Sequence, residues 1–409
     1  MMSKALYELG EQPTLGSVPK LMYAQTIRQN RYGDPASAIQ REVVDVPEIG
    51  PNEVLVYVMA SSVNYNNIWA ALGTPVDIVA QHQREDTSVD FHIGGSDAAG
   101  IVYAVGSDVV WPRVGDRVVV HSGWWDENDP YIQSGGDPMT APSARVWGYD
   151  VNWGGFAQYC RAQSHMCMPM AEHLSWEQAA VATLDGSTAY RMLTGWPPHT
   201  VQRDDVVLVW GGAGGLGCFA IQIVKSMGGI PIAVVSNEDR GEYCVKLGAA
   251  GYINRRNYEH WGVMPDWKAE QAYSTWLRGA RDVGRAIWDI LGERRSPRIV
   301  FEHPGEATMP TSVFVCDTAG MVVICAGTTG YNAVVDLRYL WTRQKRIQGS
   351  HCANDEQAVA FNDMVIAGQI DPCLGAVFNF DDTARAHQMM YEGVNPPGKM
   401  AILVNAVPS

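Results

Sequence analysis

The stretch from Val206 to Ser236, "VVLVWGGAGGLGCFAIQIVKSMGGIPIAVVS", decides the fold. Its first five residues form an apolar run that predicts a buried strand, the segment "GCFAIQIVKSMG" has helical spacing, and "IPIAVVS" predicts the next strand. The same alternation continues through "RIVFEHPG" at 298–305 and "MVVICAG" at 321–327. This pattern is typical of an α/β fold with a doubly wound parallel sheet.

The turn between the first strand and its helix carries a glycine motif. Gly212, Gly214 and Gly217 have the spacing GxGxxG, directly after a predicted strand and at the start of a predicted helix. Glycines let the backbone approach a pyrophosphate, and the helix N-terminus offers N–H groups to it. A tight turn without a ligand is the alternative. The dinucleotide-binding candidates in this turn are Gly212, Gly214, Gly215, Leu216 and Gly217.

The end of the second strand indicates which dinucleotide binds. An acidic residue at this tip would bind the ribose 2′-hydroxyl of NAD, but "VVSNEDR" has Ser236 at the tip, with Arg240 within reach of a 2′-phosphate. These residues favour NADPH. Glu238 and Asp239 leave NAD as an alternative, and a solvated helix position is the alternative for Arg240. The remaining cofactor-binding candidates are His303 and Gly327, in the next two strand-ending segments.

The segments on either side of this region follow another pattern. Short valine-rich runs, "NEVLVYVMA" at 52–60, "GIVYAVG" at 100–106 and "GDRVVVHSG" at 115–123, are separated by glycine and proline and predict a small barrel. After about residue 345 the pattern is mixed, and it ends in the strand-like "KMAILVNAV". We therefore expect a catalytic domain over 1–195 and 345–409, and an inserted Rossmann domain over 196–344.

Length and composition narrow the function classes. A chain of 409 residues suggests two domains, and its formal net charge of −14 argues against a nucleic-acid surface. The N-terminus lacks the apolar run of a secretory signal, and no stretch approaches 18 uninterrupted apolar residues. We expect a cytoplasmic protein that binds no membrane. The eight cysteines form no CxxC pair, which argues against structural zinc and favours reduced buried thiols.

The order of barrel first and nucleotide domain second resembles the medium-chain dehydrogenase/reductase superfamily. Its zinc-dependent members carry a Gly-His-Glu motif in the first domain, whereas "GGSDAAG" at 94–100 has Ser96 and Asp97 at the matching positions. The resemblance therefore implies a GroES-like barrel joined to a Rossmann domain, with no metal. Without a Lewis acid to polarise an alcohol or a carbonyl, reduction of an activated double bond is favoured over alcohol oxidation.

Five longer motifs narrow the resemblance. They are "SSVNYNNIW" at 61–69, "GGDPMTAPSARVWGYD" at 135–150, "IVFEHPGEAT" at 299–308, "RYLWTRQKRIQGSH" at 338–351 and "NPPGKM" at 395–400. From about residue 20 to the C-terminus the chain resembles the crotonyl-CoA carboxylase/reductase family of 2-enoyl-CoA carboxylating reductases. The resemblance implies a homotetramer, built as a dimer of dimers. It also implies that NADPH gives hydride to the β-carbon of an enoyl-CoA and that the resulting enolate attacks CO2.

The same resemblance implies which residues hold the gas. The family's anchors match Asn66 in "NYN", Tyr149 and Asp150 in "WGYD", and His351 in "GSH". An amide or imidazole N–H donates to a CO2 oxygen, and such bonds strengthen as carboxylate charge develops. The simpler alternatives are a turn cap for Asn66, a packing role for Tyr149 and a core histidine at 351. We expect the neighbouring Asn64 to be structural.

Asp150 departs from the family, which has a glutamate at this position. Its carboxylate is one methylene shorter and would fall about 1.5 Å short of the glutamate's, enough to break a hydrogen bond of about 2.8 Å. Asp150 either helps to position CO2 indirectly or only completes the turn in "VWGYDVNW".

Two alternative functions remain. The first is an enoyl-thioester reductase that protonates its enolate, which the Asp150 substitution supports. The second is a nucleotide-binding protein without turnover.

A basic segment is the candidate for the CoA end of the substrate. "DLRYLWTRQKRIQG" at 336–349 concentrates positive charge in an acidic chain, as the phosphates of CoA would require, and offers an aromatic ring to adenine. The resemblance supports Arg338 and Tyr339 most. A solvated basic face is the alternative for the other two candidates, Lys345 and Arg346.

Overall fold

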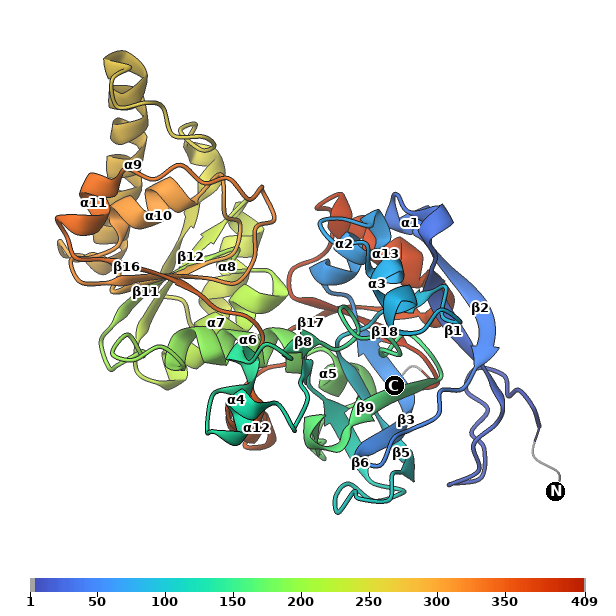
Figure 1. The fold of residues 1–409 in the computed structure, drawn as a ribbon. Coiled ribbons are helices and arrows are strands. Elements are labelled where there is room, and N and C mark those ends of the chain that lie inside the picture. Colours follow the sequence, from blue (N-terminus) through green and yellow to red (C-terminus); the bar gives the residue numbers. More distant parts are fainter. Residues whose placement is uncertain (1–3, 408–409) are drawn as a thin grey trace. The chain divides into compact units, whose positions relative to one another are not determined.

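The computed structural model describes residues 4–407, apart from the side chain of residue 85 (Figure 1). The chain divides into two compact units. Unit 2 comprises Thr188–His351 and Gln369–Asp371. Unit 1 comprises the chain up to Ser187, Cys352–Gly368 and the segment from Pro372 onward. Within the described residues, no helix has both the length and the hydropathy that crossing a membrane requires.

Unit 1 is built on a seven-stranded sheet in the order β10-β6-β5-β3-β18-β17, with β9 also paired to β3. The long strand β3 pairs antiparallel with β5, β9 and β18, so a strand near the C-terminus completes a sheet begun near the N-terminus. The strands are β3 (Glu53–Ser62), β5 (Ala98–Val105), β6 (Arg117–Val120), β9 (Tyr159–Gln163), β10 (Cys167–Pro169), β17 (Leu374–Asn379) and β18 (Lys399–Leu403).

Smaller elements complete unit 1. A three-stranded sheet has the order β2-β1-β4, and β7 pairs with β8. These strands are β1 (Leu21–Ile27), β2 (Ile39–Asp45), β4 (His92–Ile93), β7 (Gly123–Trp124) and β8 (Arg145–Val146). The helices are α1 (Pro35–Ala38), α2 (Tyr65–Leu72), α3 (Ile78–Glu85), α4 (Pro130–Gln133), α5 (Trp176–Ala180), α12 (Asp355–Ile366) and α13 (Thr383–Tyr391); α6 (Thr183–Thr194) continues into unit 2.

Unit 2 contains a six-stranded parallel sheet in the order β13-β12-β11-β14-β15-β16, which confirms the predicted doubly wound α/β fold (Figure 1). The strands are β11 (Val206–Trp210), β12 (Ile230–Val235), β13 (Gly251–Asn254), β14 (Ile299–Glu302), β15 (Met321–Ile324) and β16 (Arg346–Gly349). The helices are α7 (Gly215–Ser226), α8 (Glu238–Lys246), α9 (Glu270–Leu291), α10 (Met309–Val315) and α11 (Leu337–Trp341).

The order of these strands determines where a ligand binds. The connections from β11 lead to β12 on one side, whereas β14 lies on the other, so the sheet reverses its winding between β11 and β14. In open α/β sheets ligands bind beyond the carboxyl ends of the strands at such a reversal. β16 lies after the 344/345 boundary expected from sequence, yet it pairs parallel with β15 and belongs to this sheet.

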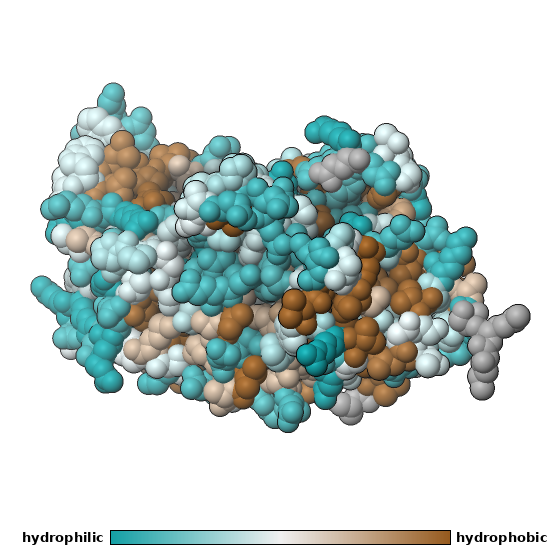
Figure 2. All heavy atoms as spheres, turned by 60° about the horizontal axis from the view of Figure 1, so that its bottom comes forward, coloured by the Kyte–Doolittle hydropathy of each residue, from teal (hydrophilic) through white to brown (hydrophobic). Residues whose placement is uncertain are grey.

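Large hydrophobic residues are exposed at several places on the surface. Figure 2 shows one face of the molecule, on which hydrophobic residues form brown patches among hydrophilic ones. In unit 2, Trp267, Leu337 and Trp341 have 59%, 59% and 63% of their surface exposed. Large exposed apolar side chains that occur together are typical of protein contact surfaces.

Candidate active site

The glycine turn lies at the carboxyl end of β11. Gly214 is the N-cap of α7 and has no side chain to cap the first N–H groups of the helix. A Cβ at Gly217 would lie 2.4 Å from the Gly211 carbonyl oxygen, and one at Gly212 would lie 2.7 Å from the Ala233 Cβ. Only glycine fits these two positions. The turn therefore has a helix N-terminus without a side-chain cap, as pyrophosphate binding requires.

The tip of β12 leads directly into α8, which carries Arg240 and Glu238 in its first turn. Asn237 caps α8, and its Oδ1 accepts the Arg240 backbone N–H at 2.9 Å, which fixes Arg240 in the first turn of that helix. The Glu238 carboxylate accepts from the Tyr252 hydroxyl at 2.6 Å and from Asn254 Nδ2 at 2.8 Å. Glu238 is thus engaged by β13, which weakens the alternative that it binds a ribose.

The loops after β14 and β15 meet at the same edge of the sheet. The His303 ring lies next to the glycine turn, with Nε2 3.1 Å from the Trp210 carbonyl oxygen. A Cβ at Gly305 would lie 3.1 Å from the Gly327 Cα, so both glycines permit close packing of the two loops. The structure therefore brings His303 and Gly327 to the edge that carries the glycine turn.

Glu302, at the end of β14, holds the first of these loops and was missed from sequence. Its carboxyl group is fully buried and accepts from the Gly305 N–H and the Thr308 hydroxyl on one oxygen, and from the Ser312 hydroxyl on the other. Burial raises the pKa of Glu302 to about 7, although these three donors oppose the shift.

Asn66 lies in the first turn of α2 and forms a chain of polar contacts with its neighbours. Asn66 Nδ2 donates to Ser96 Oγ at 2.8 Å, and Asn67 Nδ2 donates to Asn66 Oδ1 at 2.9 Å. Asn67 Oδ1 in turn accepts the Gly95 N–H at 3.0 Å. Asn66 is partly exposed, whereas Asn67 and Ser96 are fully buried. Ser96, at the position where zinc-dependent relatives have a ligand, therefore contacts the proposed CO2 anchor.

Asp97, at the second matching position, is fully engaged by the protein. It is fully buried, and its Oδ2 accepts from Ser62 Oγ at 2.6 Å and from Asn64 Nδ2 at 2.8 Å. Its Oδ1 accepts from the Thr183 hydroxyl and the Leu184 N–H. This network confirms that Asn64 has structural contacts. Lys399 donates to Asn64 Oδ1 and to Asp185, which is 2.8 Å away, and thus adds a buried cation that the sequence analysis overlooked.

Tyr149 and Asp150 lie in a tight turn after β8. Asp150 Oδ2 accepts the Val146 N–H at 2.8 Å, and the Val146 carbonyl accepts the Asp150 N–H at 2.8 Å. The aspartate therefore closes its own turn with at least one oxygen. Tyr149 packs against two hydrophobic clusters of unit 1, which include Ile39 and Leu184. His351 is the last residue of the long segment of unit 2 and follows β16.

One cluster of described residues has the composition of a metal site. Asp355 Oδ1 lies 2.9 Å from His121 Nε2 and 2.9 Å from His165 Nδ1. His121 Nδ1 accepts the Gly123 N–H at 3.1 Å, so Nε2 carries the proton that faces Asp355. A metal ligand needs that nitrogen unprotonated, so the geometry fits a clamp on the start of α12 better. Burial alone would raise the pKa of Asp355, but the two rings hold it well below its usual range.

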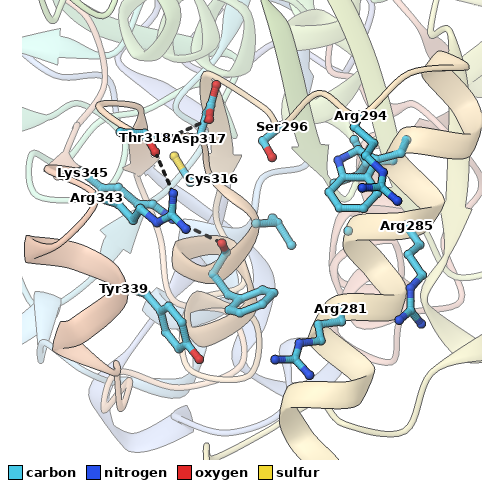
Figure 3. A pocket seen from close by; sticks show the side chains of 15 residues that line it. Arg281, Arg285, Arg294, Ser296, Cys316, Asp317, Thr318, Tyr339, Arg343 and Lys345 are labelled. Atoms are coloured by element: carbon cyan, nitrogen blue, oxygen red, sulfur yellow. Dashed lines mark hydrogen bonds between the residues drawn. The ribbon is translucent and has the colours of Figure 1, made fainter.

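Unit 2 also has a cavity of about 480 Å³ beside α9 and the end of α10 (Figure 3). Of the residues expected to bind CoA, Tyr339 and Lys345 line it. Arg338 instead pairs with Asp336 at 2.6 Å, and Arg346 donates to backbone carbonyls of 196 and 197. The cations that line the cavity are Arg281, Arg285, Arg294, Arg343 and Lys345.

The contacts of the cavity residues distinguish structural from available cations. Lys345 Nζ donates to the carbonyls of Val313 at 2.7 Å and Phe314 at 3.2 Å, so it caps α10, and burial lowers its pKa. The Tyr339 ring packs edge-on against Phe314, with centroids 4.9 Å apart. Three of the arginines precede the predicted basic segment by more than 40 residues in the chain, so spacing gave no signal for them.

Two family models match the chain: the alcohol dehydrogenase GroES-like domain over 50–172 and the zinc-binding dehydrogenase model over 215–365. A GroES-like unit combined with a Rossmann-type unit defines a medium-chain dehydrogenase/reductase. The crotonyl-CoA carboxylase/reductase of Cereibacter sphaeroides is 49% identical over 403 residues, which cover 98% of this chain and 92% of that protein. The chain belongs to the crotonyl-CoA carboxylase/reductase family.

Solved structures agree. The structure of the crotonyl-CoA carboxylase/reductase AntE in complex with NADP is 54% identical, with a TM-score of 0.96, covering 99% of this chain and 100% of that one. The 2-octenoyl-CoA carboxylase reductase CinF, in complex with NADP and 2-octenoyl-CoA, is 35% identical, with a TM-score of 0.86, covering 96% and 90%. The family assignment therefore rests on the whole length of the chain.

Proposed function

We propose that the chain is an NADPH-dependent enoyl-CoA carboxylase/reductase. It reduces a 2-enoyl-CoA such as crotonyl-CoA and carboxylates the product to an alkylmalonyl-CoA such as ethylmalonyl-CoA. The observation that carries the proposal is the Asn66 amide, which contacts Ser96 where zinc-dependent relatives have a metal ligand. The Asn66 amide, a hydrogen-bond donor suited to CO2, thus lies beside the position at which zinc-dependent relatives bind the metal that polarises an alcohol. The family membership supports the same reaction.

In this proposal, unit 2 is the NADPH-binding domain. The N–H groups at Gly214–Gly217 fit the pyrophosphate, and Arg240 fits the 2′-phosphate that distinguishes NADPH from NADH. NADPH, when bound, supplies the hydride for the β-carbon of the enoyl thioester. The tight glycine contacts and the engaged Glu238 support this assignment.

The proposed carboxylation site consists of Asn66, Tyr149, Asp150 and His351. Asn66 and His351 each donate a hydrogen bond to a CO2 oxygen, and these bonds strengthen as negative charge develops there. The Tyr149 ring excludes water from the enolate, and Asp150 acts indirectly by orienting a water or the imidazole.

The CoA end of the substrate is assigned to the cavity of unit 2. Its arginines offer paired donors to phosphate oxygens, and Tyr339 offers an aromatic face to adenine. Arg338 and Arg346 contribute only if their present partners release them, since both guanidinium groups are engaged within the protein. The strongest candidates for phosphate contacts are therefore Arg281 and Arg343, because Arg285 pairs with Asp282.

One observation favours a second candidate function. Because Asp150 closes its turn through Val146, its carboxylate is partly committed to structure. An enzyme with a weakened CO2 site would protonate the enolate and act as a plain enoyl-CoA reductase. The two functions differ in product and not in cofactor.

One assay separates them. NADPH oxidation is followed with crotonyl-CoA, with and without bicarbonate and carbonic anhydrase, and the products are resolved by mass spectrometry. Ethylmalonyl-CoA as the main product with bicarbonate is the expected result. Butyryl-CoA under all conditions would favour the plain reductase, and no NADPH oxidation would exclude both.

We also propose a homotetramer, a dimer of dimers, as the family resemblance implies. The exposed Trp267, Leu337 and Trp341 of unit 2 support a contact between copies. Light scattering after size-exclusion chromatography tests it: a mass near four times 44.8 kDa is expected, and a monomer would contradict it.

A further inference from the structure

Asn67 is fully buried beside Asn66, and the sequence alone indicated no role for it. We propose that Asn67 is a positioning residue for carboxylation: through Asn66 it fixes which side of that amide faces CO2. This inference rests on the proposed function, because it concerns the same anchor. It adds a residue that touches neither substrate nor cofactor.

Asn67 contacts a backbone group whose polarity cannot change. The Gly95 N–H can only donate a hydrogen bond, and it lies 3.0 Å from Asn67 Oδ1. That contact requires the amide oxygen of Asn67, and not its nitrogen, to face Gly95. The amide nitrogen of Asn67 must then face the other way, toward Asn66.

The next contact passes the same constraint to Asn66. Asn67 Nδ2 donates to Asn66 Oδ1 at 2.9 Å, so the oxygen of the second amide is also fixed. Asn66 Nδ2 therefore faces Ser96 Oγ, 2.8 Å away. A Ser hydroxyl can donate or accept, so Ser96 alone would tolerate either orientation of Asn66. The contact with Asn67 therefore determines the orientation of the Asn66 amide.

The packing around Asn67 leaves its amide one position. Its side chain is fully buried, and a Cβ at Gly94 would lie only 1.9 Å from Asn67 Oδ1. A side chain on residue 94 would displace the amide, so the hydrogen-bond network requires glycine at this position. Asn66 Nδ2 donates to Ser96, and among the residues that the structure describes it has no second acceptor.

This orientation matters only for the step that uses CO2. The enolate electron pair forms the bond between the α-carbon and the CO2 carbon, and a π pair of CO2 moves onto an oxygen that becomes carboxylate. An N–H donor stabilises that oxygen, whereas an amide carbonyl in its place would repel it. Hydride transfer to the β-carbon places no charge on CO2. A flipped Asn66 should therefore impair carboxylation and leave reduction largely intact.

Asn67→Asp tests the inference with little change in shape. One aspartate oxygen still accepts the Gly95 N–H, but the other is an acceptor and forces Asn66 to turn its nitrogen inward. The ratio of ethylmalonyl-CoA to butyryl-CoA at limiting bicarbonate should fall roughly tenfold or more, as for loss of one donor to a developing charge. NADPH oxidation with crotonyl-CoA should stay within about threefold.

Two further variants serve as controls. Asn405→Asp places an acid at another buried amide, one that bonds to the carbonyl groups of Val58 and Gln158, and should leave the ratio unchanged. Asn67→Ala, which frees Asn66 to turn, should lower the ratio less than Asn67→Asp and serves if the aspartate variant does not fold.

The product ratio does not depend on how much of a variant is folded, so a purely structural role would not move it. A wild-type enzyme that makes only butyryl-CoA would overturn the proposed function and this inference with it. A carboxylating wild type with an unchanged ratio in Asn67→Asp or, if that variant does not fold, in Asn67→Ala would overturn the inference alone. An equal fall in Asn405→Asp would also overturn it, since buried charge would then be the cause.

Discussion

At Asp150, one carboxylate serves a turn and is also the candidate for a role in CO2 binding. Its Oδ2 accepts the Val146 N–H, and an uncharged amide oxygen could also accept it. The charge is therefore dispensable for the turn. Replacing the carboxylate by an amide consequently separates the two roles that the sequence left open.

Asp150→Asn should keep the free energy of unfolding within about 0.5 kcal/mol of wild type, because the turn keeps its acceptor. Asp150→Ala should lose about 1 to 2 kcal/mol, since the Val146 N–H loses its partner. If Asp150 orients a water or His351, Asp150→Asn should also raise the butyryl-CoA share at limiting bicarbonate. Urea unfolding and product analysis measure the two effects. An unchanged share would leave Asp150 with the turn alone.

Arg240 is the residue to which we assign the preference for NADPH. Its backbone is fixed by the Asn237 cap, and the nearby Glu238 is engaged by Tyr252. Arg240→Ala should raise the KM for NADPH about tenfold or more while changing the KM for NADH much less, because only NADPH has a 2′-phosphate. Steady-state kinetics with both cofactors test this. Equal effects on both would refute the assignment.

Individual residues also mark the limit of the sequence analysis. The glycine turn and the residues of "GGSDAAG" were identified because their neighbours in the chain define their context. Asn67 was not, because "NYNN" offers three asparagines and only the Gly95 N–H selects their roles. Lys399 was missed for the same reason, because its partners Asn64 and Asp185 come from distant segments of the chain. The partners of Glu302 lie within ten residues of it, but the sequence does not show that its carboxyl group is buried.

At the scale of elements, the strands and helices of unit 2 follow from hydrophobic periodicity. β11, α7 and β12 lie where the apolar runs and helical spacing predict them. The end of the sheet was harder to predict, because β16 alternates partly buried and exposed residues and carries Arg346. Only its pairing with β15 identifies it as the sixth strand. The cavity depends on α9, whose arginines are far from the basic segment in sequence.

At this scale, Glu302 beside the loop after β14 predicts how the free energy of unfolding depends on pH. Burial raises the pKa of Glu302 from 4.5 to about 7, so the folded protein retains a proton there that the unfolded chain loses above pH 4.5. Stability from this group is therefore complete below pH 4.5 and is lost as pH rises toward 7. Glu302→Gln has no proton to lose. Its free energy of unfolding relative to wild type should increase from pH 5 to pH 8, by up to about 3 kcal/mol.

The measurement is urea unfolding of both proteins at the two pH values. Groups other than Glu302 titrate alike in both proteins and cancel in the difference. In the Glu302→Gln variant the new amide still accepts from Gly305 and Thr308 but turns a donor toward Ser312, which costs a constant amount at each pH. A difference that does not change with pH would mean that Glu302 is ionised in its buried site.

At the scale of the whole molecule, the global charge and the cavity have opposite signs. The chain carries −14 overall, whereas the cavity in unit 2 is lined by five cations and one acid, Asp317. A CoA ester carries several negative charges, so the overall field repels it and the cavity attracts it. Salt at 0.15 M screens exposed charges beyond about 8 Å, and it acts on both interactions.

The balance between overall repulsion and local attraction predicts that wild type and a double variant respond to salt in opposite directions. In wild type the local attraction dominates the approach to the cavity, so kcat/KM for crotonyl-CoA should fall as salt rises from about 10 to about 150 mM. In the double variant Arg281→Ala/Arg343→Ala two of the five cations are gone and the net charge falls from −14 to −16. Repulsion then outweighs attraction, so added salt should raise kcat/KM. If both proteins respond to salt alike, with the same KM, the CoA phosphates bind elsewhere on the molecule.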